Sequence, residues 1–190
     1  NTEAYPRRPE AIRQHIADYY AMISHIDWCI GHILDVLEER GILDDTIIVL
    51  TGDNGLAVGQ HGLMGKQNIY EHSVRVPLVL CGPGIPKGET REQYVYLLDI
   101  YPTLCQLCGL EVPASVEGIS FAPTFSDPDY VTRPELYLAF QSRIRGVMDG
   151  RYKLVEYRTE DLKLTQLFDL EQDPWERNNF YDIPGYEDIT

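Results

Sequence analysis

An apolar stripe with helical spacing, followed closely by a short β-branched run, places the strongest constraint on how this chain folds. The stripe steps by three and four residues, which is the repeat of one helix face. It consists of Ile12, Ile16, Tyr19, Ile23, Ile26, Ile30, Ile33 and Leu37. Gly41 follows a charged turn, and glycine is a common helix stop. The sequence therefore predicts one long helix from Glu10 to about Gly41.

Two apolar runs downstream predict strands that are buried on both faces. Thr46–Thr51 reads TIIVLT, and Val76–Leu80 reads VPLVL. Continuous runs of this kind are typical of a parallel sheet. The segment Tyr94–Leu110 predicts a third strand or strand end that leads into a helix, with Pro102 in its first turn and Gly109 at its stop. Helix, strand, loop and strand together predict a layered α/β architecture.

After Gly118 the pattern changes to short strand-like runs. They are Glu135–Phe140, Arg143–Met148, Arg151–Tyr157 and Thr165–Leu170. The Asp149-Gly150 dipeptide between two of them is a strong hairpin signal. We therefore expect a small antiparallel sheet in this part of the chain.

The net charge of −14 argues against some classes of partner. Non-specific nucleic-acid binding needs a basic face, so we expect no nucleic-acid partner. No apolar run is long enough to span a bilayer, and we expect no membrane partner. An acidic chain also repels acidic substrates, unless a cation or a local basic cluster reverses the field.

The stretch LTGDNGLAVGQHGLMGK, residues 50–66, combines polar side chains with glycines at the point where the first predicted strand ends. Asp53 and Asn54 follow that strand directly, and ligands collect at the carboxyl ends of strands in open α/β sheets. One charged and one neutral oxygen ligand suit Ca²⁺ or Mg²⁺. The alternative interpretation is an ordinary Asp-Asn-Gly turn.

Lys66 and His61 lie in the same stretch. A lysine beside a metal can hold an anionic oxygen as a point charge, and the alternative for Lys66 is a solvated surface side chain. His61 can donate to an anion or a leaving oxygen, and the alternative is a structural residue in a glycine-rich loop. Further along, Tyr70, Glu71 and Arg75 suggest a buried polar network that supports the loop. The histidines treated as non-catalytic are His15, His25, His32 and His72.

Taken together, these motifs resemble the sulfatase family of the alkaline phosphatase superfamily. The region TIIVLTGDNGLAVGQHGLMGKQNIYEHSVRVPLVLCGPGIPKG is similar to the family's second signature region, in which an apolar strand precedes Asp-His or Asp-Asn, a glycine, a lysine, Tyr-Glu and Arg-Val-Pro. LLDIYPTLCQLCGLEVP resembles the family's Asp-Ile-x-Pro-Thr-Leu helix. RGVMDGRYKLVEY and QLFDLEQDPWERNN resemble its C-terminal sheet and tail. The resemblance extends from about Arg13 to Tyr181.

The resemblance implies a fold, a metal site and a reaction. Residues 1–120 would form part of an alkaline-phosphatase-like layered sheet with helices, and residues 121–190 a small antiparallel subdomain. Asp53 and Asn54 would bind a divalent cation, Ca²⁺ or Mg²⁺. Lys66 would contact the sulfate of a sulfate-ester substrate, and His61 is the second catalytic candidate. A periplasmic or other extracytoplasmic location is implied over a cytoplasmic one, although the sequence leaves the compartment open.

One family element is not found in this chain. Sulfatases use a formylglycine nucleophile, made from the first residue of a Cys/Ser-x-Pro/Ala-x-Arg motif, and none of the four cysteines has that context. The paired aspartates that complete the family's metal site would also lie upstream. We therefore expect a C-terminal portion of a sulfatase that is inactive alone, with the formylglycine on the missing upstream part.

Two alternative functions remain open. One is a phosphonate or phosphodiester hydrolase of the same superfamily, and the other is a non-catalytic interaction module. We expect the upstream half of the same enzyme as a partner, and exposed sheet edges would also permit a homo-oligomer. The sequence does not determine the substrate.

Overall fold

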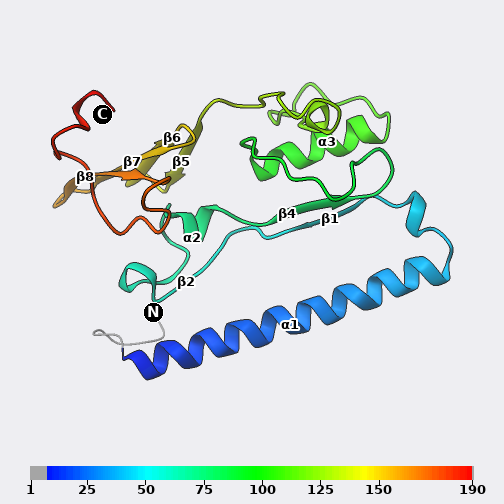
Figure 1. The fold of residues 1–190 in the computed structure, drawn as a ribbon, viewed down its shortest axis with the longest axis horizontal. Helices are drawn as coiled ribbons and strands as arrows, with labels where there is room; N and C mark the ends of the chain where they lie inside the picture. Colours follow the sequence, from blue (N-terminus) through cyan, green and yellow to red (C-terminus); the bar gives the residue numbers. More distant parts are fainter. Residues whose placement is uncertain (1–7, 190) are drawn as a thin grey trace. The chain divides into compact units, whose positions relative to one another are not determined.

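The computed structural model describes residues 8–189 (Figure 1). This part of the chain divides into two compact units. The first unit holds the chain up to Gln67 together with His72–Pro83. The second holds Asn68–Glu71 and the chain from Gly84 onward. The chain therefore passes from the first unit to the second and back within a few residues. The boundary expected at residues 120 and 121 stays a prediction.

The first unit begins with the long helix that the apolar stripe predicts. Helix α1 spans Pro9–Glu39, with proline in its first turn, where a missing amide hydrogen costs nothing. Gly41 follows it with a φ of 66°, the left-handed conformation that commonly ends helices. A short 3₁₀ turn, η1 at Leu43–Asp45, then leads to strand β1. The predicted start and stop of this helix are confirmed to within two residues.

The two apolar runs pair with each other, but not in the way that the sequence suggests. Strand β1, Ile48–Thr51, runs antiparallel to β4, Leu78–Cys81. The register pairs Thr51 with Leu78, so the segment between them leaves and returns at one end of the ribbon. A parallel pair would need a crossover to the opposite end. The expectation of a parallel sheet is therefore wrong for this pair. The expected burial on both faces is wrong too, because neither strand contains a fully buried residue.

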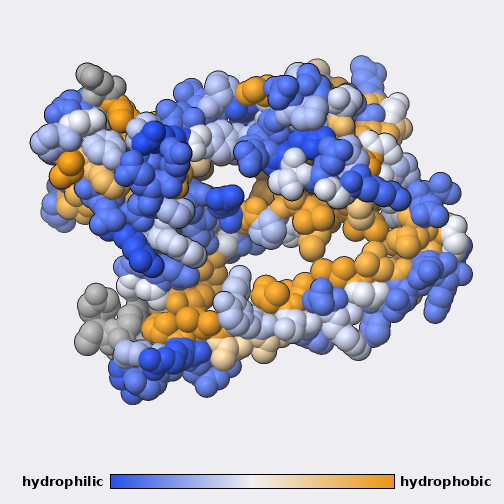
Figure 2. Space-filling view, in the orientation of Figure 1, coloured by the Kyte–Doolittle hydropathy of each residue, from blue (hydrophilic) through white to orange (hydrophobic). Residues whose placement is uncertain are grey.

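The apolar stripe of α1 is only partly covered, and none of its residues is buried in a core. The helix has no buried residue, and Ile26 and Ile33 are 51% and 61% exposed. Figure 2 shows orange, hydrophobic side chains along the length of this helix. The expected amphipathic pattern is present, but the described residues cover its apolar face only in part: Ile12 lies against Gly59, whereas Ile23, Ile26 and Ile33 are exposed.

The second unit contains helix α3 and a four-stranded antiparallel sheet. The strands are β5 at Leu136–Phe140, β6 at Ile144–Met148, β7 at Tyr152–Arg158 and β8 at Lys163–Asp169, in the order β5-β6-β7-β8. The Asp149-Gly150 hairpin joins β6 and β7, and Gly150 has a φ of 105°. The small antiparallel sheet predicted from turn signals is confirmed. Another 3₁₀ turn, η4, spans Ala122–Phe125, and a last one, η5, spans Glu187–Ile189.

Helix α3 spans Ile100–Leu107, with Pro102 near its start and Gly109 just beyond its end, as predicted. The strand expected before it is not formed between residues 91 and 96. Instead, the amide of Tyr96 donates to Asp99 Oδ2 at 2.7 Å, which closes a 3₁₀ turn, η3 at Leu97–Asp99. The Tyr96 amide is thus used within the turn and is not available to a neighbouring strand.

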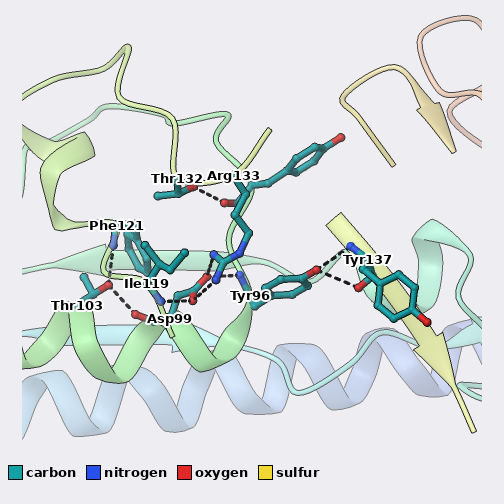
Figure 3. A network of polar contacts seen from close by, with 9 residues as sticks. Tyr96, Asp99, Thr103, Ile119, Phe121, Thr132, Arg133 and Tyr137 are labelled. Atoms are coloured by element: carbon teal, nitrogen blue, oxygen red, sulfur yellow. Dashed lines mark hydrogen bonds and ion pairs between the residues drawn. The ribbon is translucent and has the colours of Figure 1, made fainter. Parts of the chain in front are cut away.

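Asp99 is the centre of a buried polar network in this unit (Figure 3). Its side chain is fully buried and forms a bidentate ion pair with Arg133. In one of the two hydrogen bonds, Arg133 Nη2 donates to Asp99 Oδ1 at 2.9 Å. Asp99 also accepts the amide of Ile119 at 2.7 Å. The guanidinium stacks 4.7 Å from the centre of the Tyr96 ring, whose hydroxyl donates to the carbonyl of Tyr137. One carboxylate thus connects the start of α3 to two later segments of the chain.

Across the described residues, no helix has the length and apolar character needed to cross a membrane.

Candidate functional site

The loop that follows β1 carries the two predicted metal ligands. Asp53 Oδ1 accepts the amide of Asn54 at 2.9 Å, which fixes the bend directly after the strand. The Asp53 carboxylate is 85% exposed. The Asn54 side-chain amide donates to the carbonyl of Gly55 at 2.9 Å, so its oxygen is left to face other groups.

Gly55 fixes this loop because no side chain fits at its position. A Cβ there would lie 2.1 Å from the carbonyl oxygen of His72, a separation that no real contact shows. The Gly55 amide donates to the carbonyl of Ser73 at 2.9 Å. The backbone next to Asn54 is therefore pressed against helix α2, which spans Glu71–Val74.

Lys66 returns to the two ligand candidates through a short β-hairpin. Strand β2, Ala57–Val58, pairs antiparallel with β3, Met64–Gly65, and Ala57 and Val58 are buried. Lys66 follows directly, and its Nζ lies 2.8 Å from Asn54 Oδ1 and 3.9 Å from Asp53 Oδ2. Three of the four predicted site residues therefore meet at one point.

His61 lies at the tip of the same hairpin in a conformation that is unusual for a residue with a side chain. Its φ is 53°, inside the short 3₁₀ turn η2 at Gln60–Gly62. Non-glycine residues in this region cost free energy and persist where the surroundings demand it. The His61 ring is exposed, and its centre lies 5.6 Å from that of His72. Only the fold brings His72 to this position, because no local pattern around it indicates a contact with His61.

The donor set suits a hard divalent cation. A carboxylate and a carboxamide oxygen are ligands that Ca²⁺ and Mg²⁺ prefer over softer sites. Two side chains supply only part of the six to eight oxygen ligands that Ca²⁺ takes. Within residues 8–189, no group of three or more His, Cys, Asp or Glu side chains could hold a metal ion. The residues present therefore fit part of such a site.

A buried charge cluster that the sequence analysis only partly anticipated lies in the second unit. Lys153 Nζ is 3.0 Å from Glu71 Oε1 and 2.8 Å from Glu176 Oε1. Lys153 is fully buried and the Glu176 side chain is 1% exposed. Burial raises the pKa of Glu176 above its ordinary value, although the neighbouring ammonium opposes this shift. Arg75, expected in a network with Glu71, is exposed and belongs to the first unit.

Tyr70, the third residue expected in that network, does lie in a buried polar contact. Its hydroxyl donates to Gln166 Oε1 at 2.9 Å and accepts the hydroxyl of Tyr157 at 3.1 Å. Burial and this hydrogen bond raise the pKa of Tyr157. The partners of Tyr70 and Glu71 lie far along the chain, so no local pattern could have identified them.

Two family models match this chain. One, described as "Sulfatase", matches residues 1–110, and the other, described as "N-sulphoglucosamine sulphohydrolase, C-terminal", matches residues 59–190. Each covers more than half of the chain.

Curated relatives carry the same family identity. The choline-sulfatase of Rhizobium meliloti strain 1021 is 37% identical over 182 residues, and arylsulfatase K of Xenopus laevis is 32% identical over 190 residues. Both alignments cover 92% of this chain and 35% of the relative. The chain thus spans about a third of the length of the curated relatives it matches.

Solved structures share the fold. BT4656 in complex with its substrate D-glucosamine-2-N,6-O-disulfate has a TM-score of 0.83 and 29% identity, covering 94% of this chain and 38% of that one. The phosphonate monoester hydrolase of Agrobacterium radiobacter has a TM-score of 0.85 and 28% identity, covering 98% and 41%. The α/β fold with a small C-terminal antiparallel sheet is that of these relatives, and the chain belongs to the sulfatase family of the alkaline phosphatase superfamily.

Proposed function

We propose that this chain is the part of a sulfuric ester hydrolase that supplies a sulfate-binding lysine and part of the metal site. The observation that carries the proposal is the convergence of Lys66 Nζ on Asn54 Oδ1 and Asp53 Oδ2, at 2.8 Å and 3.9 Å. A lysine and two oxygen ligands at one point form a local site for a cation and an anionic substrate. Such a site offsets the long-range repulsion between an acidic protein and a sulfate ester.

The proposed reaction is the hydrolysis of a sulfate ester, and each of the four candidate side chains has a role in it. Asp53 and Asn54 would hold Ca²⁺ or Mg²⁺, which when bound acts as a Lewis acid on sulfate oxygens. Lys66 binds a sulfate oxygen through its ammonium and stabilises the negative charge that develops there. His61, at the tip of the adjacent hairpin, donates a proton to the oxygen of the leaving alcohol.

The remaining parts of the active site lie outside this chain in our proposal. Two oxygen ligands are too few for Ca²⁺, and none of the four cysteines lies in the family's nucleophile motif. We infer that the upstream part of the same protein supplies the other ligands and the formylglycine, and that this chain alone does not turn over sulfate esters. The exposed apolar face of α1 supports an upstream partner, because such faces are normally covered.

A phosphonate monoester hydrolase is the second candidate, because a solved enzyme of that name matches the chain with a TM-score of 0.85. Both reactions need a cation and a lysine beside a tetrahedral anionic group. The full-length protein is assayed with the 4-nitrophenyl ester of sulfate and with that of a phosphonate. We expect the higher kcat/KM for the sulfate ester, and a preference for the phosphonate would reverse the assignment.

Metal binding tests the site without reference to the substrate. Titration calorimetry of Ca²⁺ into the full-length protein should give binding that Asp53→Ala abolishes. The matched control is Asp44→Ala, which removes an exposed carboxylate of the same unit. Unchanged Ca²⁺ binding by Asp53→Ala would remove Asp53 from the metal site.

A further inference from the structure

The four residues Asn68–Glu71 are held by the second unit, although the residues on both sides of them belong to the first. Asn68, Ile69 and Tyr70 are all buried. The segment is only four residues long. The contacts that hold it therefore also restrict its chain neighbours, Gln67 and His72.

Apolar and aromatic contacts form the first part of this attachment. The Tyr70 ring packs edge-on against Phe168 of β8, with centroids 5.9 Å apart. Ile69 packs so closely on Gly146 of β6 that a Cβ there would lie 2.7 Å from Ile69 Cδ1. Glycine at this position therefore makes room for the segment.

Buried charges form the second part. The Lys153 ammonium lies between the carboxylates of Glu71 and Glu176, and Glu176 Oε2 accepts the backbone amide of Glu71 at 2.7 Å. One cation with two carboxylates is a poor stabiliser, because replacing buried ions by apolar side chains is often neutral or favourable. Its presence is better explained by the geometry that it imposes on Glu71.

The turn that presents Glu176 is itself strained. Glu176 has a φ of 54°, and its amide donates to the carbonyl of Asp173 at 3.0 Å. Asp173 Oδ2 in turn accepts the amide of Asn178 at 2.7 Å. A non-glycine residue keeps this conformation only when its surroundings determine it, and here they direct the carboxylate at Glu71.

A continuous chain of contacts leads from Glu71 to the candidate metal ligands. Glu71 is the first residue of helix α2, so Glu176 satisfies an amide that has no partner within the helix. Two residues later in α2, the carbonyl of Ser73 accepts the amide of Gly55, the residue next to Asn54. Lys66 lies two residues before the anchored segment, and α2 begins at the last residue of that segment, Glu71.

We propose that Lys153 and Glu176 are positioning residues, which hold Glu71 and α2 so that Lys66 and the Asp53-Asn54 loop keep their mutual geometry. The inference rests on the proposed function only for its effect on turnover. The expected structural effect on residues 64–67 and 72–74 rests on the contacts alone.

The test uses the full-length protein with Glu176→Gln and Lys153→Met. The control is Glu160→Gln, which removes an exposed carboxylate in the turn between β7 and β8. Glu176→Asp is a milder variant that keeps the charge and shortens the side chain that accepts the Glu71 amide. It keeps the test decisive if the charge variants do not fold. Native-state hydrogen exchange and steady-state kinetics with 4-nitrophenyl sulfate are measured on each.

We expect amide exchange about tenfold faster at residues 64–67 and 72–74 in the variants, with α3 unchanged. We also expect kcat/KM to fall by about 10–100-fold, as for other residues that orient metal ligands without touching the metal themselves. Faster exchange confined to residues 68–71, or spread equally to α3, would overturn the positioning role. If the unmodified protein does not hydrolyse the ester, the proposed function fails while the exchange result still decides this inference.

Discussion

At the scale of single residues, the ammonium of Lys66 lies against both oxygen-bearing side chains of the loop after β1. Removing it with Lys66→Ala should lower the turnover of a sulfate ester by the full-length protein by about a hundredfold or more, since one charge-stabilising donor is lost. Lys87→Ala, which removes an exposed lysine, is the control and should leave kcat unchanged. Equal rates for the two variants would remove Lys66 from catalysis.

Glu176 gives a prediction about pH. Burial raises the pKa of its carboxyl above the ordinary value of 4.5, so the folded state holds this proton more tightly than the unfolded state. The stability from this group is fully present below about pH 4.5 and is lost as the pH rises through the raised folded pKa. The Glu176→Gln variant should lack this loss.

Urea unfolding of this chain, followed between pH 4 and 8, measures the effect. The difference in unfolding free energy between Glu176→Gln and Glu160→Gln, whose carboxylate is exposed, should change with pH across this range. Asp169 acts in the opposite sense, because the hydrogen bond from Arg151 lowers its pKa, and comparing two variants that both retain Asp169 removes its contribution. Two parallel curves would mean that Glu176 titrates normally.

At the scale of elements, the Asp99 network joins α3 to the segments around Ile119 and Arg133 (Figure 3). The Arg133 side chain is 13% exposed, so Asp99→Asn leaves a largely buried guanidinium without its counter-charge. We expect the variant to lose about 3–5 kcal/mol of unfolding free energy in this chain. Asp129→Asn, at an exposed position, is the control, and a similar Tm for both variants would contradict the prediction.

The strands show which features of the local sequence were sufficient to predict secondary structure. The four strands β5 to β8 match the predicted runs because alternating side chains and the Asp149-Gly150 turn specify a hairpin locally. Strand β1 was placed correctly from its β-branched residues, but its direction relative to β4 was not. That direction depends on the end of β1 to which the 26 residues between the two strands return. It is a property of this loop and not of either strand.

At the scale of the whole molecule, the exposed apolar face of α1 predicts how this chain behaves by itself. Ile23, Ile26 and Ile33 are each about half exposed, and such a face drives association in water. Sedimentation of this chain should therefore show self-association that a triple substitution of these isoleucines to lysine abolishes. A wild-type chain that stays monomeric at all concentrations would contradict this.

The sequence by itself determined the elements whose causes are local. The period of the apolar residues specified α1, glycine and proline specified the ends of α1 and α3, and the order of the motifs around Asp53 and Lys66 pointed to the sulfatase family. Only the tertiary structure decided that Lys66 meets Asn54, that His61 lies beside His72, and that Glu176 and Lys153 enclose Glu71. These contacts join residues as many as 105 positions apart. Their formation depends on how hairpins, turns and close glycine contacts fold the chain back, and no local preference carries that information.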